Sequence, residues 1–132
     1  MNEGFELHDS VVETVETTAE TVVVRFRPAY IHRSEGRPGI DSGSGWLQDL
    51  DMFILGGVAE SLPDAFPATL IDGFLSAGSS HWENLIPLTP GDGDPVRLSA
   101  LTTEGETLAI AGRAAKVVSL GGANFLEAFP GD

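Results

Sequence analysis

Two histidines could meet at the open end of one predicted hairpin, and imidazole is the side chain best suited to proton transfer and metal binding near neutral pH. Residues 11–17 and 21–27 are rich in valine and threonine, which favours two antiparallel strands joined by a short turn. Extending that pairing beyond the first strand places His8 opposite Ile31 or His32. A slip of one residue would change the face that each side chain occupies, so this interpretation depends on the register.

Other polar side chains would gather at the same end of the hairpin. Tyr30 and Arg33 flank the second histidine. Asp9 follows the first histidine, and Asp41 lies in a nearby predicted loop. Two imidazoles with a phenol, a guanidinium and a carboxylate could bind a metal or a small ligand, or carry out acid–base catalysis. The alternative is that these histidines are hydrogen-bonded structural groups, because metal sites commonly space their histidines closely, as in H-x-H or H-E-x-x-H.

The rest of the sequence offers little support for a metal or a cofactor. A metal site would take its ligands from His8, His32 and His81, which are the only histidines in the chain. Gly91-Asp92-Gly93-Asp94 is similar to the start of a calcium loop but lacks the later acidic ligands of that motif. Gly43-Ser44-Gly45 lacks the phosphate-binding fingerprints of nucleotide sites. We therefore predict no cofactor.

The run His8-Asp9-Ser10 contains the three residue types of a hydrolase triad, but it does not predict one. Side chains alternate along an extended strand, so Asp9 would point away from both of its neighbours. A triad requires the three groups to converge in space. The sequence also lacks the G-x-S-x-G motif of a nucleophile elbow. We therefore predict no catalytic residues, and the sequence favours a protein that is not an enzyme.

Four arginines form a local basic island in an otherwise acidic chain. Arg25, Arg27, Arg33 and Arg37 lie close together and are opposed locally only by Glu35. One interpretation is that these arginines pair with carboxylates of neighbouring strands. The other is that they form an anion site or one half of a protein interface.

Two tryptophans, Trp46 and Trp82, each begin a predicted strand beside a serine-rich loop. Aromatic side chains in such positions usually cover a core, and the alternative is an aromatic wall for a ligand or a partner. The candidate residues for binding a ligand or partner are His8, Asp9, Tyr30, His32, Arg33, Arg37 and Trp46.

The elements that must position these residues are strands. The chain has 132 residues, 42% of them hydrophobic, and no cysteine, which fits one domain, residues 1–132, with a core and no disulfide. β-Branched runs punctuated by glycine, proline and aspartate recur roughly every 10 residues, which predicts about eight to ten short strands. We expect an all-β antiparallel sandwich or barrel with little or no helix.

Alternation assigns side chains to the two faces of several predicted strands. In the strand at 21–27, Val22, Val24 and Phe26 should face the core. Further strands are expected at residues 46–55, 82–88, 115–120 and 124–129. In the first of these, Asp49 and Asp51 should face solvent.

The charge of the chain argues against some classes of partner. With 20 acidic and 7 basic residues, the net charge is -13. Nucleic acids and anionic membranes both require clustered lysine and arginine, so we predict neither as a partner. No apolar run reaches the roughly 18 to 20 residues that span a bilayer, and the first residues lack a signal-peptide pattern, which favours a cytoplasmic protein. An acidic surface suits a cationic protein partner, and edge strands would also allow a homo-oligomer.

Several segments resemble a group of small bacterial β-rich proteins. Leu7-His8-Asp9-Ser10 is followed by the valine-rich hairpin and by residues 29–34, and the chain closes with residues 125–131. Through its His-Asp pair, the chain also resembles immunity proteins of bacterial toxin loci, which are small, acidic and cytoplasmic. The resemblance implies a non-catalytic protein that acts through protein–protein contacts, and it carries over no catalytic residue. The alternatives are a ligand- or metal-binding domain around His8 and His32, and a homo-oligomeric structural subunit.

Overall fold

Eleven antiparallel strands make up the computed structural model, which describes residues 2–37 and 41–129. The strands are β1 (Asn2–Glu6), β2 (Val11–Thr18), β3 (Thr21–Ser34), β4 (Gly43–Leu55), β5 (Val58–Ser61), β6 (Ala68–Ala77), β7 (Ser80–Glu83), β8 (Leu85–Pro87), β9 (Val96–Thr102), β10 (Thr107–Gly112) and β11 (Ala114–Phe129). The prediction of an all-β fold is confirmed. Within the described ranges there is no helix, and hence none long and apolar enough to cross a membrane.

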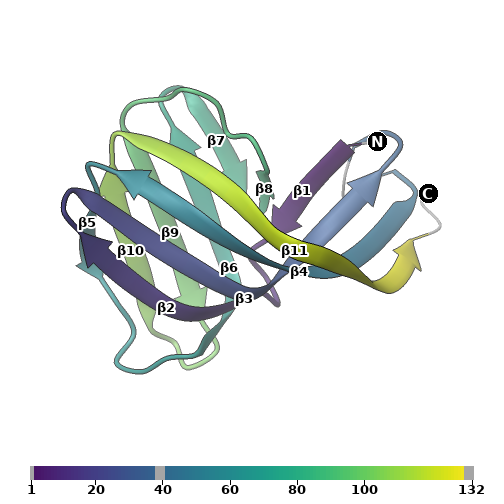
Figure 1. Cartoon of the computed structure of the whole chain (residues 1–132), viewed down its shortest axis with the longest axis horizontal. Helices are drawn as coiled ribbons and strands as arrows, with labels where there is room; N and C mark the ends of the chain where they lie inside the picture. The colour runs from purple at the N-terminus through teal and green to yellow at the C-terminus, as the bar shows by residue number, and fades with distance from the viewer. Residues whose placement is uncertain (1, 38–40, 130–132) are drawn as a thin grey trace.

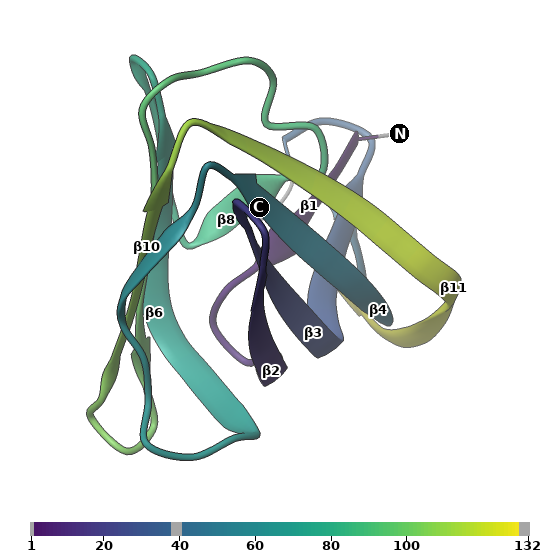
Figure 2. The same ribbon diagram turned by 60° about the vertical axis from the view of Figure 1, so that its left-hand side comes forward.

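The strands form one antiparallel sheet that is not closed and that folds over into two layers, as in a β-sandwich. The first layer runs β2–β3–β4–β11, and the second runs β6–β9–β10–β5 with β7 beside β6. β2 and β6 join the layers at one corner, where Val12 pairs with Ala68. The strands of the two layers cross steeply (Figure 1), and Figure 2 shows the first layer lying across the second.

The predicted N-terminal hairpin is confirmed. β2 and β3 pair in the expected register from their turn as far as Thr14 opposite Arg25. Val22, Val24 and Phe26 point between the two layers and are fully buried, as the alternation of strand side chains predicts. The neighbouring arginines lie on the outer face of the first layer.

The core lies between the two layers, and strands of both layers supply it. Phe5 and Phe26 meet edge to face there, with their ring centres 5.4 Å apart. The largest fully buried side chains are Phe5, Phe26, Leu7, Ile31, Leu50, Met52, Ile54, Leu70, Leu75, Ile86, Leu98 and Leu108. Burying each such side chain contributes about 1.5–3 kcal/mol, so these contacts outweigh any single polar pair in stabilising the fold.

Three strands are long enough to extend beyond the second layer, with 14 residues in β3, 13 in β4 and 16 in β11. Pro28 cannot donate a backbone hydrogen bond, and the pairing of β3 with β4 shifts between Phe26 and Ala29. The pairing of β11 with β4 shifts between Leu120 and Asn124. The two bulges flank the same part of β4, so the sheet bends there.

Some predicted strand boundaries were wrong. Residues 115–120 and 124–129, predicted as two strands, belong to one strand, β11, because the glycines between them form a bulge rather than a turn. Residues 82–88, predicted as one strand, are divided by Asn84, whose φ of 62° interrupts the extended backbone. The strands are therefore more numerous than expected, and three of them are much longer.

Candidate functional site

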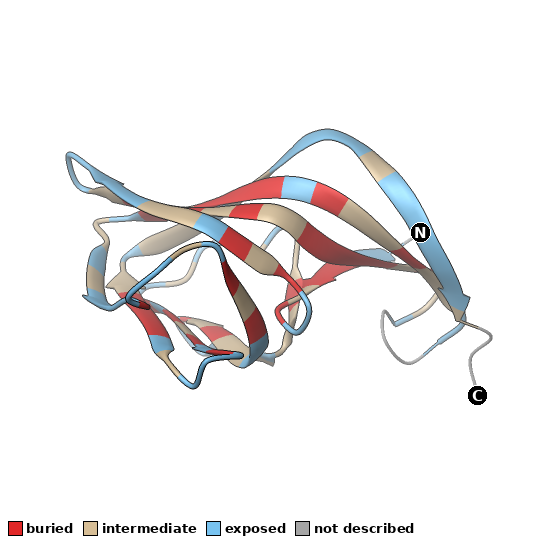
Figure 3. Cartoon of the chain, turned by 90° about the horizontal axis from the view of Figure 1, so that it is seen from below, coloured by how far each residue is buried: buried red, intermediate tan, exposed pale blue. Residues whose placement is uncertain are grey.

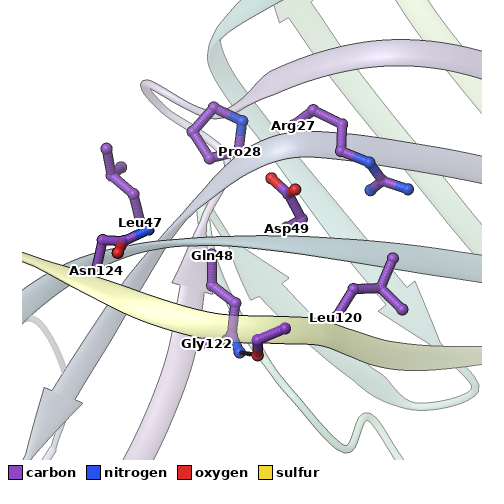
Figure 4. Close-up of a pocket in the computed structure, with 9 residues that line it drawn as sticks. Arg27, Pro28, Leu47, Gln48, Asp49, Leu120, Gly122 and Asn124 are labelled. Carbon is purple, nitrogen blue, oxygen red and sulfur yellow. Dashed lines mark hydrogen bonds between the residues drawn. The ribbon is translucent and has the colours of Figure 1, made fainter.

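An arm of the first layer carries most of the predicted site residues. The arm consists of β1 and of β3, β4 and β11 beyond the two bulges, and it extends past the second layer (Figure 1). At its base, the amide nitrogen of Gln48 donates a 3.0 Å hydrogen bond to the carbonyl oxygen of Gly121, in the bulge of β11. Arg27, Asp49 and Asn124 help to line a hollow of about 490 Å³ at this point (Figure 4).

Tyr30 and His32 lie on one face of β3, and each has a carboxylate partner. Nε2 of His32 lies 2.9 Å from Oε2 of Glu6. The hydroxyl of Tyr30 donates a 2.7 Å hydrogen bond to Oε1 of Glu127 in β11. Nδ2 of Asn84 donates a 3.0 Å hydrogen bond to the other oxygen of Glu6. Since Tyr30 and His32 are buried, these bonds satisfy polar groups that water reaches poorly.

Two aromatic rings pack against the imidazole of His32. The ring centre of Tyr30 lies 5.1 Å away, and the ring of Phe129 stacks at 5.0 Å with an interplanar angle of 12°. Gly45 lies opposite His32 on β4. A Cβ atom at Gly45 would overlap the phenol of Tyr30, so only glycine at this position leaves room for the buried tyrosine.

These contacts shift two pKa values. The hydrogen bond to His32 lowers the pKa of Glu6 below its usual value of 4.5, and it outweighs the opposing effect of burial. Burial raises the pKa of Tyr30 above its usual value of 10, and the hydrogen bond to Glu127 adds to the rise. At neutral pH, Glu6 is therefore ionised and Tyr30 keeps its proton, which are the states that their hydrogen bonds require.

The carboxylate–imidazole pair has the form of the base in a catalytic triad, but the hydroxyl of Ser10 is committed to the backbone. The hydroxyl of Ser10 donates to the carbonyl oxygen of Glu6 and accepts a 3.0 Å hydrogen bond from the backbone nitrogen of Tyr30. Ser10 is also fully buried. The Ser10 hydroxyl therefore links the backbone of β1 to that of β3.

The opposite face of the arm carries Arg33 and Trp46. The guanidinium carbon of Arg33 lies 4.5 Å from the centre of the Trp46 ring, a cation–π contact. Nε of Arg33 lies 3.3 Å from a carboxylate oxygen of Glu3. Phe125 of β11 packs edge-on against Trp46, with ring centres 5.2 Å apart, yet it is 58% exposed. Trp46 thus packs against the core on one side. On its other side, Phe125 shields the Trp46 ring only partly from solvent.

The predicted pairing of His8 with residues 31 or 32 was wrong. The chain between β1 and β2 makes a turn closed by backbone hydrogen bonds, in which Asp9 adopts a φ of 70°. This turn shifts the register, so that Gly4 lies opposite His32. His8 and Asp9 are exposed in the turn, and their side chains lie 3.3 Å apart.

Each histidine has its own carboxylate partner. The pairs are His8 with Asp9, His32 with Glu6, and His81 with Glu83. Among residues 2–37 and 41–129, no group of three or more His, Cys, Asp or Glu side chains is arranged to hold a metal ion. Arg37 is exposed, and its backbone nitrogen donates to the carboxylate of Asp41. Residues 38–40 of the predicted loop lie outside the described residues.

Asp51 is buried, so the prediction that it faces solvent was wrong. It lies on the outer face of β4, as alternation predicts, but Arg25 and Arg27 of β3 cover it at 2.8 and 2.9 Å. Arg25 also pairs with Glu16, and Arg27 with Glu13, both on β2. Since Arg33 pairs with Glu3, three of the four arginines of the basic island are paired with carboxylates within the protein. Pairing the predicted strands at 21–27 and 46–55 could have revealed the contacts of Asp51 with Arg25 and Arg27.

Three residues that contact Tyr30 and His32 or their partners escaped the sequence analysis, namely Glu6, Asn84 and Glu127. Glu127 and its partner Tyr30 are separated by 97 residues in the chain. The registers that bring such partners together depend on the turn before β2 and on the bulges of β3 and β11. No local pattern in the sequence joins these residues to β3.

The second layer and its loops are more uniformly acidic than the first layer. From Val58 in β5 to Gly112 in β10, the chain holds eight acidic residues and a single arginine, Arg97. Arg97 pairs with Glu60 at 2.6 Å. The exposed carboxylates include Asp64, Asp72, Glu83, Asp92, Asp94 and Glu104.

Comparison with known protein families, with curated proteins and with solved structures found no match for this chain. Its geometry and its charge are therefore what indicate a function.

Proposed function

We propose that this chain is a non-catalytic protein that binds a cationic protein partner through its second layer. The observation that carries this proposal is the net charge of the segment from β5 to β10, which contains eight acidic residues and one arginine. That arginine, Arg97, is itself paired with Glu60. A lysine- or arginine-rich partner would be drawn to this layer, because complementary charge speeds association and suppresses wrong partners.

Apolar side chains among these carboxylates support a protein as the partner. Leu62, Ile71 and Leu101 are 40%, 40% and 39% exposed. Leu101 on β9 lies opposite Asp72 on β6, so apolar and acidic groups are neighbours on the outer face of the layer. Protein interfaces commonly combine an apolar centre with a polar rim, and this face has both.

The hydrogen bonds and ion pairs of the candidate polar groups support a non-catalytic role. Ser10 is held between two backbone groups, and each histidine is paired with a carboxylate. A small acidic protein that acts by binding could neutralise a basic toxin in the cytoplasm, as an immunity protein does. That role is the most concrete form of the proposal.

The test compares two charge-reversal variants of equal net charge. Asp72→Lys with Glu104→Lys changes the second layer, and Glu20→Lys with Glu35→Lys changes exposed positions of the first layer. Affinity purification from the source cell identifies the partner, and titration with the purified partner measures the affinity of each variant. We expect a basic partner, an affinity that falls with added salt, and a much larger loss for the second-layer variant. Equal losses, an acidic partner or no specific partner would contradict the proposal.

A further inference from the structure

We propose that two copies of this chain associate through β11, antiparallel to each other, about a two-fold axis near Gly121 and Gly122. β11 has 16 residues and lies at the end of the strand order. It pairs with β4 along one side, and no other described strand pairs with its second side. An open edge of this length is a template for pairing with another chain.

β11 also presents apolar side chains to solvent. Most of the strand is exposed, as the pale colour in Figure 3 shows. Leu120, Phe125 and Leu126 are 37%, 58% and 47% exposed. A second strand laid along this edge would remove apolar surface from water, which is the main driving force of most protein association.

The charge distribution favours a second copy as the occupant. The net charge of -13 makes two copies repel each other over most of their surface. β11 carries one lysine and one glutamate, and its net charge is zero. The opposite edge of the sheet is β5, which has only four residues and carries Glu60. Of the two ends of the strand order, β11 is therefore the one at which two copies repel least.

The two charges of β11 are placed symmetrically along the strand. Lys116 lies two residues after its first residue, and Glu127 lies two residues before its last. Against β4, Lys116 and Glu127 lie at equal distances on either side of Asp49, which is opposite Leu120. A two-fold axis beside the glycine pair therefore brings Lys116 opposite Glu127 of the partner subunit at both ends of the interface. Lys116 pairs across the sheet with Phe53, and Glu127 with Gly45, which are positions on one face of β4. The opposite charges therefore meet on the same face of the joined sheet.

The bulge in β11 divides this interface into two segments. The register with β4 shifts between Leu120 and Asn124 and again between Phe125 and Glu127. We therefore expect a ladder on each side of the axis, the one after the axis being interrupted, in place of one unbroken ladder. A Cβ atom added at Gly121 or Gly122 would meet nothing within 4 Å. The glycines therefore leave space for two backbones to approach at the axis.

The arm positions Glu127 for this contact. Its Oε1 accepts the hydrogen bond from Tyr30, which is anchored in the buried face of β3. The described residues give Oε2 no hydrogen-bond partner, so it can accept a bond from the lysine of a second copy. The buried network of the arm would thus hold one half of each intermolecular ion pair in place.

A charge swap tests the interface in sedimentation velocity experiments over a range of concentrations. We expect the protein to form dimers, and Lys116→Glu or Glu127→Lys alone to weaken the dimer about tenfold, since each creates two like-charge contacts. The double variant should restore the dimer, although it also lacks the bond to Tyr30. Arg113→Glu makes the same charge change as Lys116→Glu just outside β11, and its dimer should be almost unchanged.

A cysteine at the axis gives an independent readout, because the chain has no cysteine of its own. Under mild oxidation, Gly122→Cys should form a disulfide-linked dimer rapidly, and Ser79→Cys, at an exposed turn, should not. A protein that stays monomeric at every concentration would overturn the proposal. A dimer whose dissociation constant is the same in the single charge variants would also overturn it. So would a dimer that crosslinks no faster at position 122 than at position 79.

Discussion

Nε2 of His32 lies 2.9 Å from a carboxylate oxygen of Glu6, in a contact that runs diagonally across the pairing of β1 with β3. Gly4 is the residue directly opposite His32, and Glu6 lies opposite Tyr30. The contact fastens the first strand to the buried face of the arm and makes the stability of the arm depend on the ionisation of Glu6.

Glu6→Gln should make the free energy of unfolding less dependent on pH in acidic solution. The pKa of Glu6 is lowered in the folded protein, so its contribution is present above its usual value of 4.5 and is lost as the pH falls through the folded value. Glutamine cannot titrate, so the free energy of unfolding of the variant should change less between about pH 5 and pH 3. Urea unfolding at several pH values measures this slope. Glu83→Gln, at an exposed position, is the control, and equal slopes for both variants would contradict the prediction.

Tyr30→Phe should loosen the end of β11. The substitution removes the hydrogen bond to Glu127, and we expect a loss of about 1–2 kcal/mol in the free energy of unfolding. Hydrogen exchange should accelerate in residues 124–129. The pKa of Tyr30 is raised, so its contribution is present below its usual value of 10 and is lost as the pH rises through the folded value. The variant should lack that alkaline loss, and Glu127→Gln, which keeps an acceptor, should cost less.

Asp51→Asn should be strongly destabilising, although charged residues on strand faces usually tolerate substitution. Asp51 is 5% exposed and sits under Arg25 and Arg27, so the variant leaves two guanidinium groups without their shared partner. We expect a loss of about 3 kcal/mol in the free energy of unfolding, measured by chemical denaturation. Asp49→Asn, two residues away and exposed, should change it by less than about 0.5 kcal/mol. Similar effects at both positions would rule out the buried pairing.

Gly45→Ala should disturb the arm through Tyr30. The new methyl group would overlap the phenol, so the ring must move away from Glu127. Overpacking of this kind costs about 1–3 kcal/mol in the free energy of unfolding. Gly122→Ala is the matched control, since its methyl group would meet nothing within 4 Å. Thermal unfolding at low protein concentration compares the two, and equal midpoints would contradict the prediction.

Local sequence patterns were enough to predict the class of the fold and the first hairpin. The burial of Val22, Val24 and Phe26 follows from alternation, and the register near the turn follows from the short connection between the strands. Both signals are local. They depend on residues a few positions apart, which is why the prediction survives in the structure as far as Thr14.

The contacts between polar side chains could not be predicted in the same way, because they join segments that are distant in the chain. The turn that contains Asp9 moved His8 away from His32, because a connection of a few residues can shift a register that the hairpin alone would extend. Alternation assigned Asp51 to the correct face of β4. Whether its carboxylate is exposed to solvent depends on Arg25 and Arg27 of the neighbouring strand. The partner of Tyr30 lies 97 residues away, and two bulges set the register that brings it there. Contacts between strands that are distant in sequence depend on every shift of register along the intervening strands. Local sequence patterns do not predict the total shift.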